Sequence, residues 1–91
     1  MYAVVFRDSV SKILKKLYKR DRAIYFQIMS KVEEISLSPE HYKNLRYGMK
    51  DYKRVHIGHY VLLFSIEENT VIIEDFDHHD VIYDQSTGQP H

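Results

Sequence analysis

Histidines, basic residues and tyrosines gather in the stretch from Lys43 to Tyr83. Metal-independent cleavage of RNA needs a base that takes a proton from the 2′-hydroxyl, an acid that protonates the leaving 5′-oxygen, and cations that stabilise the charged phosphorus centre. Histidine suits the first two tasks because its ordinary pKa of about 6.5 lets it hold or release a proton near neutrality. Lysine and arginine suit the third task, and aromatic rings stack on unpaired bases. The sequence therefore carries the residue types of a ribonuclease site.

The candidate catalytic residues lie at the ends of predicted strands. His56 and His59 flank a predicted turn, His79 follows the last long strand, and Arg54 and Tyr83 lie close to them in the sequence. Because the ends of neighbouring strands converge in a meander, we expect the three histidines to meet on one side of the sheet. The candidate RNA-binding residues are four cations and one tyrosine: Lys43, Arg46, Lys50, Lys53 and Tyr52. The plainer alternative is a solvated basic loop with strand-end histidines that only form hydrogen bonds.

Charged residues are segregated along the chain, although the net charge is zero. Residues 1–54 carry 13 basic and 6 acidic groups, whereas residues 55–91 carry 7 acidic groups and no basic one. Such asymmetry indicates a surface that faces a polyanion. The alternative is that the two halves interleave in space and the charges mix. The lysines at 12, 15, 16 and 19 fit a solvated helix face or a contact with a nucleic acid.

The length and composition fit one cytoplasmic domain. The 91 residues are 44% hydrophobic and include no cysteine, so we expect a single packed domain over residues 1–84, a flexible tail over 85–91 and a reducing compartment. No run approaches the roughly 20 apolar residues of a membrane helix. We also expect no metal and no other cofactor, because His78 and His79 would point to opposite faces of an extended strand and no recognised zinc spacing is present.

Hydrophobic periodicity predicts a strand and two helices in the first half of the chain. Residues 2–6 are β-branched and aromatic, as in a strand. Asp8 or Ser9 can cap a first helix, and Asp21 a second one that ends before Pro39. The helices share a very short connection, so they should form an antiparallel hairpin. The apolar stripes that they must bury are Val10, Ile13, Leu14, Leu17 and Tyr18 in the first, and Ile24, Ile28, Val32 and Ile35 in the second.

The second half predicts strands joined by tight turns. Residues 39–51 are polar and show no period, which is typical of a loop. Residues 52–57, 60–66 and 70–76 read as strands, with turns at 58–59 and 67–69. Short connections favour an antiparallel meander, and the helical hairpin must cover one face of that sheet. We therefore predict a two-layer α+β fold in which an N-terminal strand and a helical hairpin pack on an antiparallel sheet.

This order of elements, with two short segments, resembles the RelE/ParE toxin superfamily over roughly residues 1–83. The segments are YKRVHIGHY (residues 52–60) and DHHDVIY (residues 77–83). The resemblance implies a RelE-like fold and a toxin of a type II toxin–antitoxin system, held inactive by a cognate antitoxin. Ribonuclease members of the superfamily cut mRNA while it sits on the ribosome, whereas ParE members poison DNA gyrase.

Within the superfamily the chain is most similar to the YafQ-like ribonuclease branch, in which histidines and an acidic residue replace a basic triad. Residues 52–57, 60–64 and 79–83 follow that branch's motifs in turn. The resemblance implies that His79 is the general acid, that His56 is a base or phosphate ligand, and that Tyr83 contacts RNA. His59 falls one residue away from the branch's acidic position. Two arginines common in the superfamily are Val61 and His79 here, which favours the alternatives: a non-catalytic or gyrase-inhibiting toxin, or a degenerate nucleic-acid-binding module.

Overall fold

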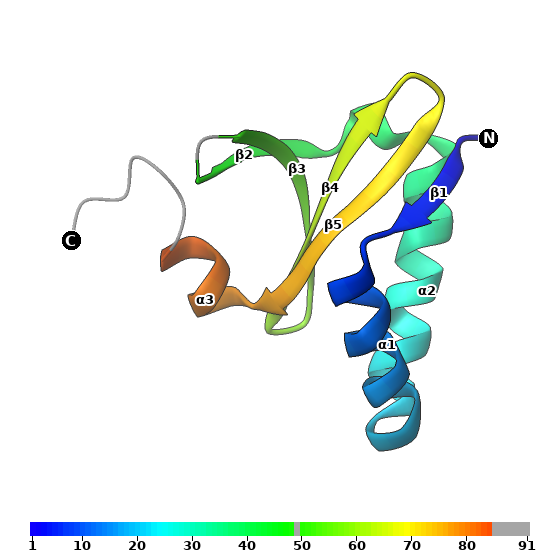
Figure 1. Cartoon of the computed structure of the whole chain (residues 1–91), viewed down its shortest axis with the longest axis vertical. Coiled ribbons are helices and arrows are strands. Elements are labelled where there is room, and N and C mark those ends of the chain that lie inside the picture. The colour runs from blue at the N-terminus through cyan, green and yellow to red at the C-terminus, as the bar shows by residue number, and fades with distance from the viewer. Residues whose placement is uncertain (49, 85–91) are drawn as a thin grey trace.

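The structure is a computed structural model that describes residues 1–48 and 50–84 (Figure 1). Its elements, in chain order, are β1 (Ala3–Phe6), α1 (Asp8–Arg20), α2 (Arg22–Leu37), the 3₁₀ turn η1 (Pro39–His41), β2 (Lys43–Tyr47), β3 (Lys50–Ile57), β4 (Tyr60–Glu67), β5 (Thr70–His78) and α3 (His79–Asp84). The tail expected at residues 85–91 lies outside the described residues.

One five-stranded sheet, with strand order β1-β5-β4-β3-β2, organises the fold. Strands β3 to β5 form the predicted antiparallel meander, and β2, which was not predicted, extends it at the β3 edge. The sequence did not indicate which strand pairs with the N-terminal strand. In the structure β1 pairs with β5 in parallel, so the sheet is mixed. The parallel direction follows from where β1 begins: the Ala3 N–H donates to the Asn69 carbonyl in the β4–β5 turn at 3.1 Å. The predicted α+β class is confirmed.

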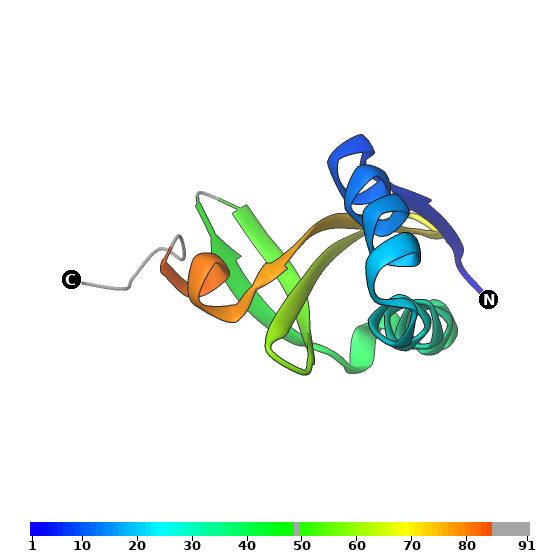
Figure 2. The same ribbon diagram turned by 90° about the horizontal axis from the view of Figure 1, so that it is seen from below.

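The helical hairpin covers one face of the sheet, as predicted (Figure 2). The residues that are most deeply buried between the two layers are Val10, Ile28, Ile35, Leu62, Phe64, Val71 and Ile73. Asp21 caps α2, because its carboxylate accepts a hydrogen bond from the Ile24 N–H at 3.2 Å. The prediction that Asp8 or Ser9 caps the first helix is wrong: Arg7 is the capping residue, and Asp8 lies in the first turn, where a negative charge complements the helix dipole.

Residues 39–51 are not the loop that their composition predicts. They contain η1, the edge strand β2 and the start of β3. Only alternate residues of β2, namely Leu45 and Tyr47, contact a hydrophobic cluster, and the others are exposed. An edge strand that is half exposed and rich in cations therefore carries too weak a hydrophobic pattern to be recognised.

A short helix on the opposite face of the sheet was also not predicted. Strand β5 ends at His78, and α3 begins at His79 (Figure 1). Ile82 is fully buried there against Val61 and Leu63 of β4, and half-buried tyrosines surround it. Thus α3 adds a partial third layer to the two that were expected. Within the described part of the chain, no helix is long and apolar enough to cross a membrane.

Candidate active site

Strand β3 presents two candidate residues on the sheet face that carries α3. Side chains alternate along a strand, and Ile57 packs into the core beneath the helical hairpin. Arg54 and His56 therefore point to the other face. Their partners on β4 are Leu63 and Val61, which are the residues that α3 covers.

Helix α3 brings His79 and Tyr83 to the same place. The two residues are four apart and share one face of the helix, with ring centroids 4.5 Å apart. The His79 ring lies 5.5 Å from the His56 ring, and the Tyr83 ring stacks on His56 at 5.9 Å with an interplanar angle of 15°. The backbone N–H of His79 donates to the His59 carbonyl at 2.8 Å, and this bond joins the start of α3 to the β3–β4 turn. We call Arg54, His56, His79 and Tyr83 the His–Tyr cluster.

The Tyr83 hydroxyl connects the other members of the His–Tyr cluster. It accepts a hydrogen bond from the Arg54 guanidinium and lies 3.4 Å from Nε2 of His56, where it donates when that nitrogen is unprotonated. The guanidinium carbon also lies 5.6 Å from the centre of the Tyr83 ring, within the range of a cation–π contact. Arg54 still has further N–H groups with which it can bind a phosphate.

Burial lowers the pKa of His56 below its ordinary value, and the positive charges of Arg54 and His79 lower it further. A histidine with a lowered pKa is mostly neutral near pH 7, so that one ring nitrogen carries a free lone pair. His56 is therefore suited to accepting a proton.

His59 does not join the His–Tyr cluster. Its ring stacks on His78, with centroids 6.2 Å apart and an interplanar angle of 7°, and His78 also contacts Tyr60. The expectation that three histidines meet is therefore correct for His56 and His79 and wrong for His59. The physical reason is that Gly58, at φ +61°, and His59 form the tight turn, which directs the His59 ring away from His56. His78 and His79 were expected to lie together on an extended strand and do not, because β5 ends at His78 and α3 begins at His79, and Nδ1 of each ring lies within 4.0 Å of the Asp80 carboxylate.

Three of the five candidate RNA-binding residues share the face of the His–Tyr cluster. Residues that pair directly across an antiparallel ladder lie on the same face. Lys43 pairs with Arg54, and Tyr52 pairs with Leu45, which belongs to the small cluster around Ile82. Lys50 is two residues from Tyr52 and follows the same alternation.

The other two candidates, Arg46 and Lys53, lie on the opposite face by the same alternation. The Lys53 ammonium donates to the Tyr42 carbonyl at 3.1 Å and to Oδ1 of Asn44 at 3.2 Å. Arg46 pairs with Asp51 across the ladder. For Arg46 the alternation was not visible in the sequence, because residues 39–51 had been interpreted as a loop. Lys53 lies in the predicted strand 52–57, so its position opposite to Arg54 could have been expected.

The comparisons with known proteins agree on one superfamily. Residues 4–83 match the family described as the ParE toxin of the type II toxin–antitoxin system parDE. The chain belongs to this family. It is 52% identical over 86 residues to a candidate toxin of Methanocaldococcus jannaschii, RelE4, and the match covers 91% of this chain and 92% of that one. An uncharacterised protein of Methanosarcina mazei is 43% identical over 86 residues, which cover 91% of this chain and 100% of that protein.

The fold also matches a solved structure of the same superfamily. The archaeal RelE–RelB complex from Pyrococcus horikoshii superposes with a TM-score of 0.69 at 20% sequence identity, over 86% of this chain and 94% of that one. This likeness shows that the fold is RelE-like. The chain is thus a RelE/ParE-type toxin of a type II toxin–antitoxin system.

The burial of Val61 bears on where this toxin can present a positive charge. Val61 stands where the resemblance to the superfamily places an arginine, and it is fully buried beneath α3. Its position therefore cannot present a charge to a ligand without displacing Ile82. Within the His–Tyr cluster the arginine is Arg54, which comes from the neighbouring strand β3.

Sequence reasoning missed two carboxylates on this side of the sheet. Oδ1 of Asp80 lies 3.5 Å from Nδ1 of His79, and its position next to that histidine was a signal that could have been used. Asp75 accepts a hydrogen bond from the Tyr47 hydroxyl at 3.1 Å. Burial and the charge of Asp75 raise the pKa of Tyr47 to about 12, so that this hydroxyl stays protonated. Among the described residues, no three histidines or carboxylates are grouped as metal ligands.

Proposed function

We propose that this toxin is a metal-independent endoribonuclease that cuts mRNA on the ribosome. The observation that carries the proposal is the His–Tyr cluster: a histidine with a lowered pKa, a second histidine and an arginine meet on one exposed face of the sheet. These are the base, the acid and the cation that attack by a 2′-hydroxyl requires.

In the proposed reaction, neutral His56 takes the proton from the 2′-hydroxyl, and the 2′-oxygen attacks the phosphorus. The bond to the 5′-oxygen breaks, and protonated His79 gives that oxygen its proton. The products are a 2′,3′-cyclic phosphate, which water then opens, and a 5′-hydroxyl. Arg54 stabilises the charge on the phosphate oxygens, and Tyr83 holds Arg54 and His56 in place.

The surrounding surface fits a single-stranded RNA substrate. Lys43, Lys50 and Tyr52 lie on the same face as the His–Tyr cluster and offer two charges and one stacking ring. The proposal places the enzyme in the cytoplasm, with translating ribosomes. By analogy with the RelE–RelB complex, we propose that a cognate antitoxin binds the chain and covers this basic face.

A second candidate function is inhibition of DNA gyrase without catalysis. Two observations favour it: the family that matches is described by its ParE toxin, and Val61 replaces an arginine by a buried side chain. A further non-catalytic alternative is a degenerate module that only binds nucleic acid.

Induction of the chain in bacteria without an antitoxin separates these functions. We expect growth arrest with mRNA cut inside reading frames, and fragments that end in a 2′,3′-cyclic phosphate or 5′-hydroxyl when they are mapped by end-specific ligation. Growth arrest with intact mRNA and double-strand DNA breaks would replace the nuclease with the gyrase inhibitor.

A further inference from the structure

Part of β3 has an edge that no described strand covers. The ladder between β2 and β3 ends at the pair Lys43–Arg54, whereas β3 continues to Ile57. Residues 55–57 therefore have no strand paired with them on the side away from β4. This edge lies between the face of the His–Tyr cluster and the face that carries the helices.

Two hollows adjoin this edge, and both are lined by His56. One, of about 360 Å³, lies between η1 and β3 and is also lined by His41, Lys43 and Arg54. The other, of about 480 Å³, lies between α2 and the end of β3 and is also lined by Gln27, Lys31 and Gly58. His56 lines both hollows, which therefore follow one another along this edge of β3. We call them together the β3-edge trough.

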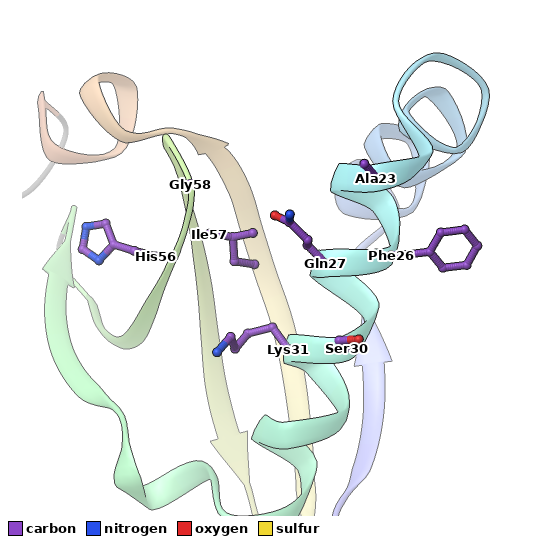
Figure 3. A pocket seen from close by; sticks show the side chains of 8 residues that line it. All are labelled: Ala23, Phe26, Gln27, Ser30, Lys31, His56, Ile57 and Gly58. Carbon is purple, nitrogen blue, oxygen red and sulfur yellow. The ribbon is translucent and has the colours of Figure 1, made fainter.

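The α2 wall of the trough offers hydrogen-bond donors. Gln27 and Lys31 are one helical turn apart, so they share a face of α2. Figure 3 shows both side chains reaching from α2 toward β3, whereas Phe26 points away from it. Lys31 also lies 3.5 Å from Glu34, but that carboxylate is 60% exposed and does not line the trough, so the pair is weak.

The charged residues that line the trough are all basic. Lys31, Lys43 and Arg54 line it together with two histidines, and none of its described lining residues is acidic. A polyanion that passes the His–Tyr cluster would therefore find its next favourable contacts along this edge. RNA fits better than an acidic peptide, because the trough leads directly to the side chains that would act on a phosphodiester.

We infer that the β3-edge trough holds the backbone of single-stranded RNA beside the scissile phosphate, and that Lys31, assisted by Gln27, binds a phosphate at its far end. This inference rests on the proposed nuclease function. It assigns a substrate contact to α2, an element that the sequence connects only with the hydrophobic core.

The test measures binding of uncleavable 2′-O-methyl RNA, as a trinucleotide and as a longer oligonucleotide, by fluorescence anisotropy at several salt concentrations. Lys31→Ala should weaken the binding of the longer RNA by about fivefold. It should also reduce the slope of log Kd against log salt concentration by about 0.7, the value for one phosphate contact on a single strand. The trinucleotide should be unaffected. Lys12→Ala, which removes one exposed charge from α1, is the matched control and should leave both measurements unchanged.

The outcomes separate this inference from the nuclease proposal. If Lys31→Ala binds RNA as Lys12→Ala does, while the wild type still cuts ribosome-bound mRNA, the trough is wrong and the nuclease stands. If polyglutamate, and not RNA, binds in a way that depends on Lys31, the trough is a peptide site and the inference is also wrong. A wild type that cuts no mRNA on ribosomes overturns the proposed function itself.

Discussion

The hydroxyl oxygen of Tyr83 lies 3.4 Å from Nε2 of His56, and the Tyr83 ring stacks on the same imidazole. The contact joins the last helix to the end of β3, through two residues that are 27 apart in the sequence. Because the same hydroxyl also accepts a hydrogen bond from Arg54, one side chain orients both the proposed base and the proposed phosphate-binding cation.

Tyr83→Phe tests this bridging role. The variant keeps the ring that stacks on His56 and His79 but removes the hydroxyl that holds Arg54. We expect single-turnover cleavage of ribosome-bound mRNA to fall about tenfold, equivalent to one charge-assisted hydrogen bond, with little change in melting temperature. Tyr60→Phe is the control, because it also removes one tyrosine hydroxyl and its ring packs on Phe76, away from the His–Tyr cluster. Equal rates for Tyr83→Phe and the wild type would mean that the hydroxyl plays no part.

Neighbouring histidines provide a matched pair of variants for the proposed acid. His79→Ala should lower single-turnover cleavage by about a hundredfold or more, the usual loss when a general acid is removed. His78→Ala should be nearly silent, because that ring stacks on His59 and not on the His–Tyr cluster. The double variant of His56 and His79 should lose less than the product of the single losses, because the two residues act as a unit.

These variants need a folding control, since a collapsed chain also loses activity. His56, His78 and His79 are all exposed, so the thermal melting curves of these variants should lie close to that of the wild type. A well-folded His79→Ala that cleaves at the wild-type rate contradicts the histidine mechanism. A large loss in His78→Ala would move the site to the His59–His78 pair.

The lowered pKa of His56 predicts the pH dependence of cleavage. A base must be unprotonated, so the limb of the profile on which the rate rises with pH should have its midpoint below pH 6.5, the ordinary histidine value. Arg54→Gln removes one of the positive charges that lower the pKa, so this rising limb should move to higher pH as well as to lower rates. The measurement is a pH–rate profile of single-turnover cleavage, with the titration of the His56 ring followed in parallel by NMR. A limb that stays in place in both measurements would refute the electrostatic coupling between Arg54 and His56.

Much of the fold could be predicted because its signals are local. The capping aspartate Asp21, the proline that follows α2 and the apolar runs of β4 and β5 each determine an element without reference to the rest of the chain. The pairing of β1 with β5 joins Ala3 to Thr70. No local pattern encodes a contact between residues so far apart. The strand itself could therefore be predicted, but its parallel pairing with β5 could not.

The candidate site was only partly predictable, for a related reason. The contact between His56 and His79 could be predicted, because the ends of β3 and β5 lie at the same end of an antiparallel meander. The orientation of His59 depends on the turn at Gly58, and that of Arg46 depends on the register of β2 with β3, which was hidden because β2 had been interpreted as a loop. The helix α3 has only six residues, too few for a periodic pattern.

Because α3 is so short, its position should depend on Ile82. That side chain is fully buried against Val61 and Leu63, whereas the adjacent Val81 is 39% exposed. Ile82→Ala should lower the free energy of unfolding by about 2–4 kcal/mol, as for other large-to-small changes in a core, and should loosen the helix that holds His79 and Tyr83. Val81→Ala is the matched control and should change stability by less than about 0.5 kcal/mol. Urea unfolding gives the stability, and amide exchange of residues 79–84 reports the docking of α3. Cleavage by Ile82→Ala should fall at temperatures where the chain is still folded. If exchange in α3 and cleavage both stay at wild-type levels in this variant, α3 is held by contacts other than Ile82, and the His–Tyr cluster does not depend on that anchor.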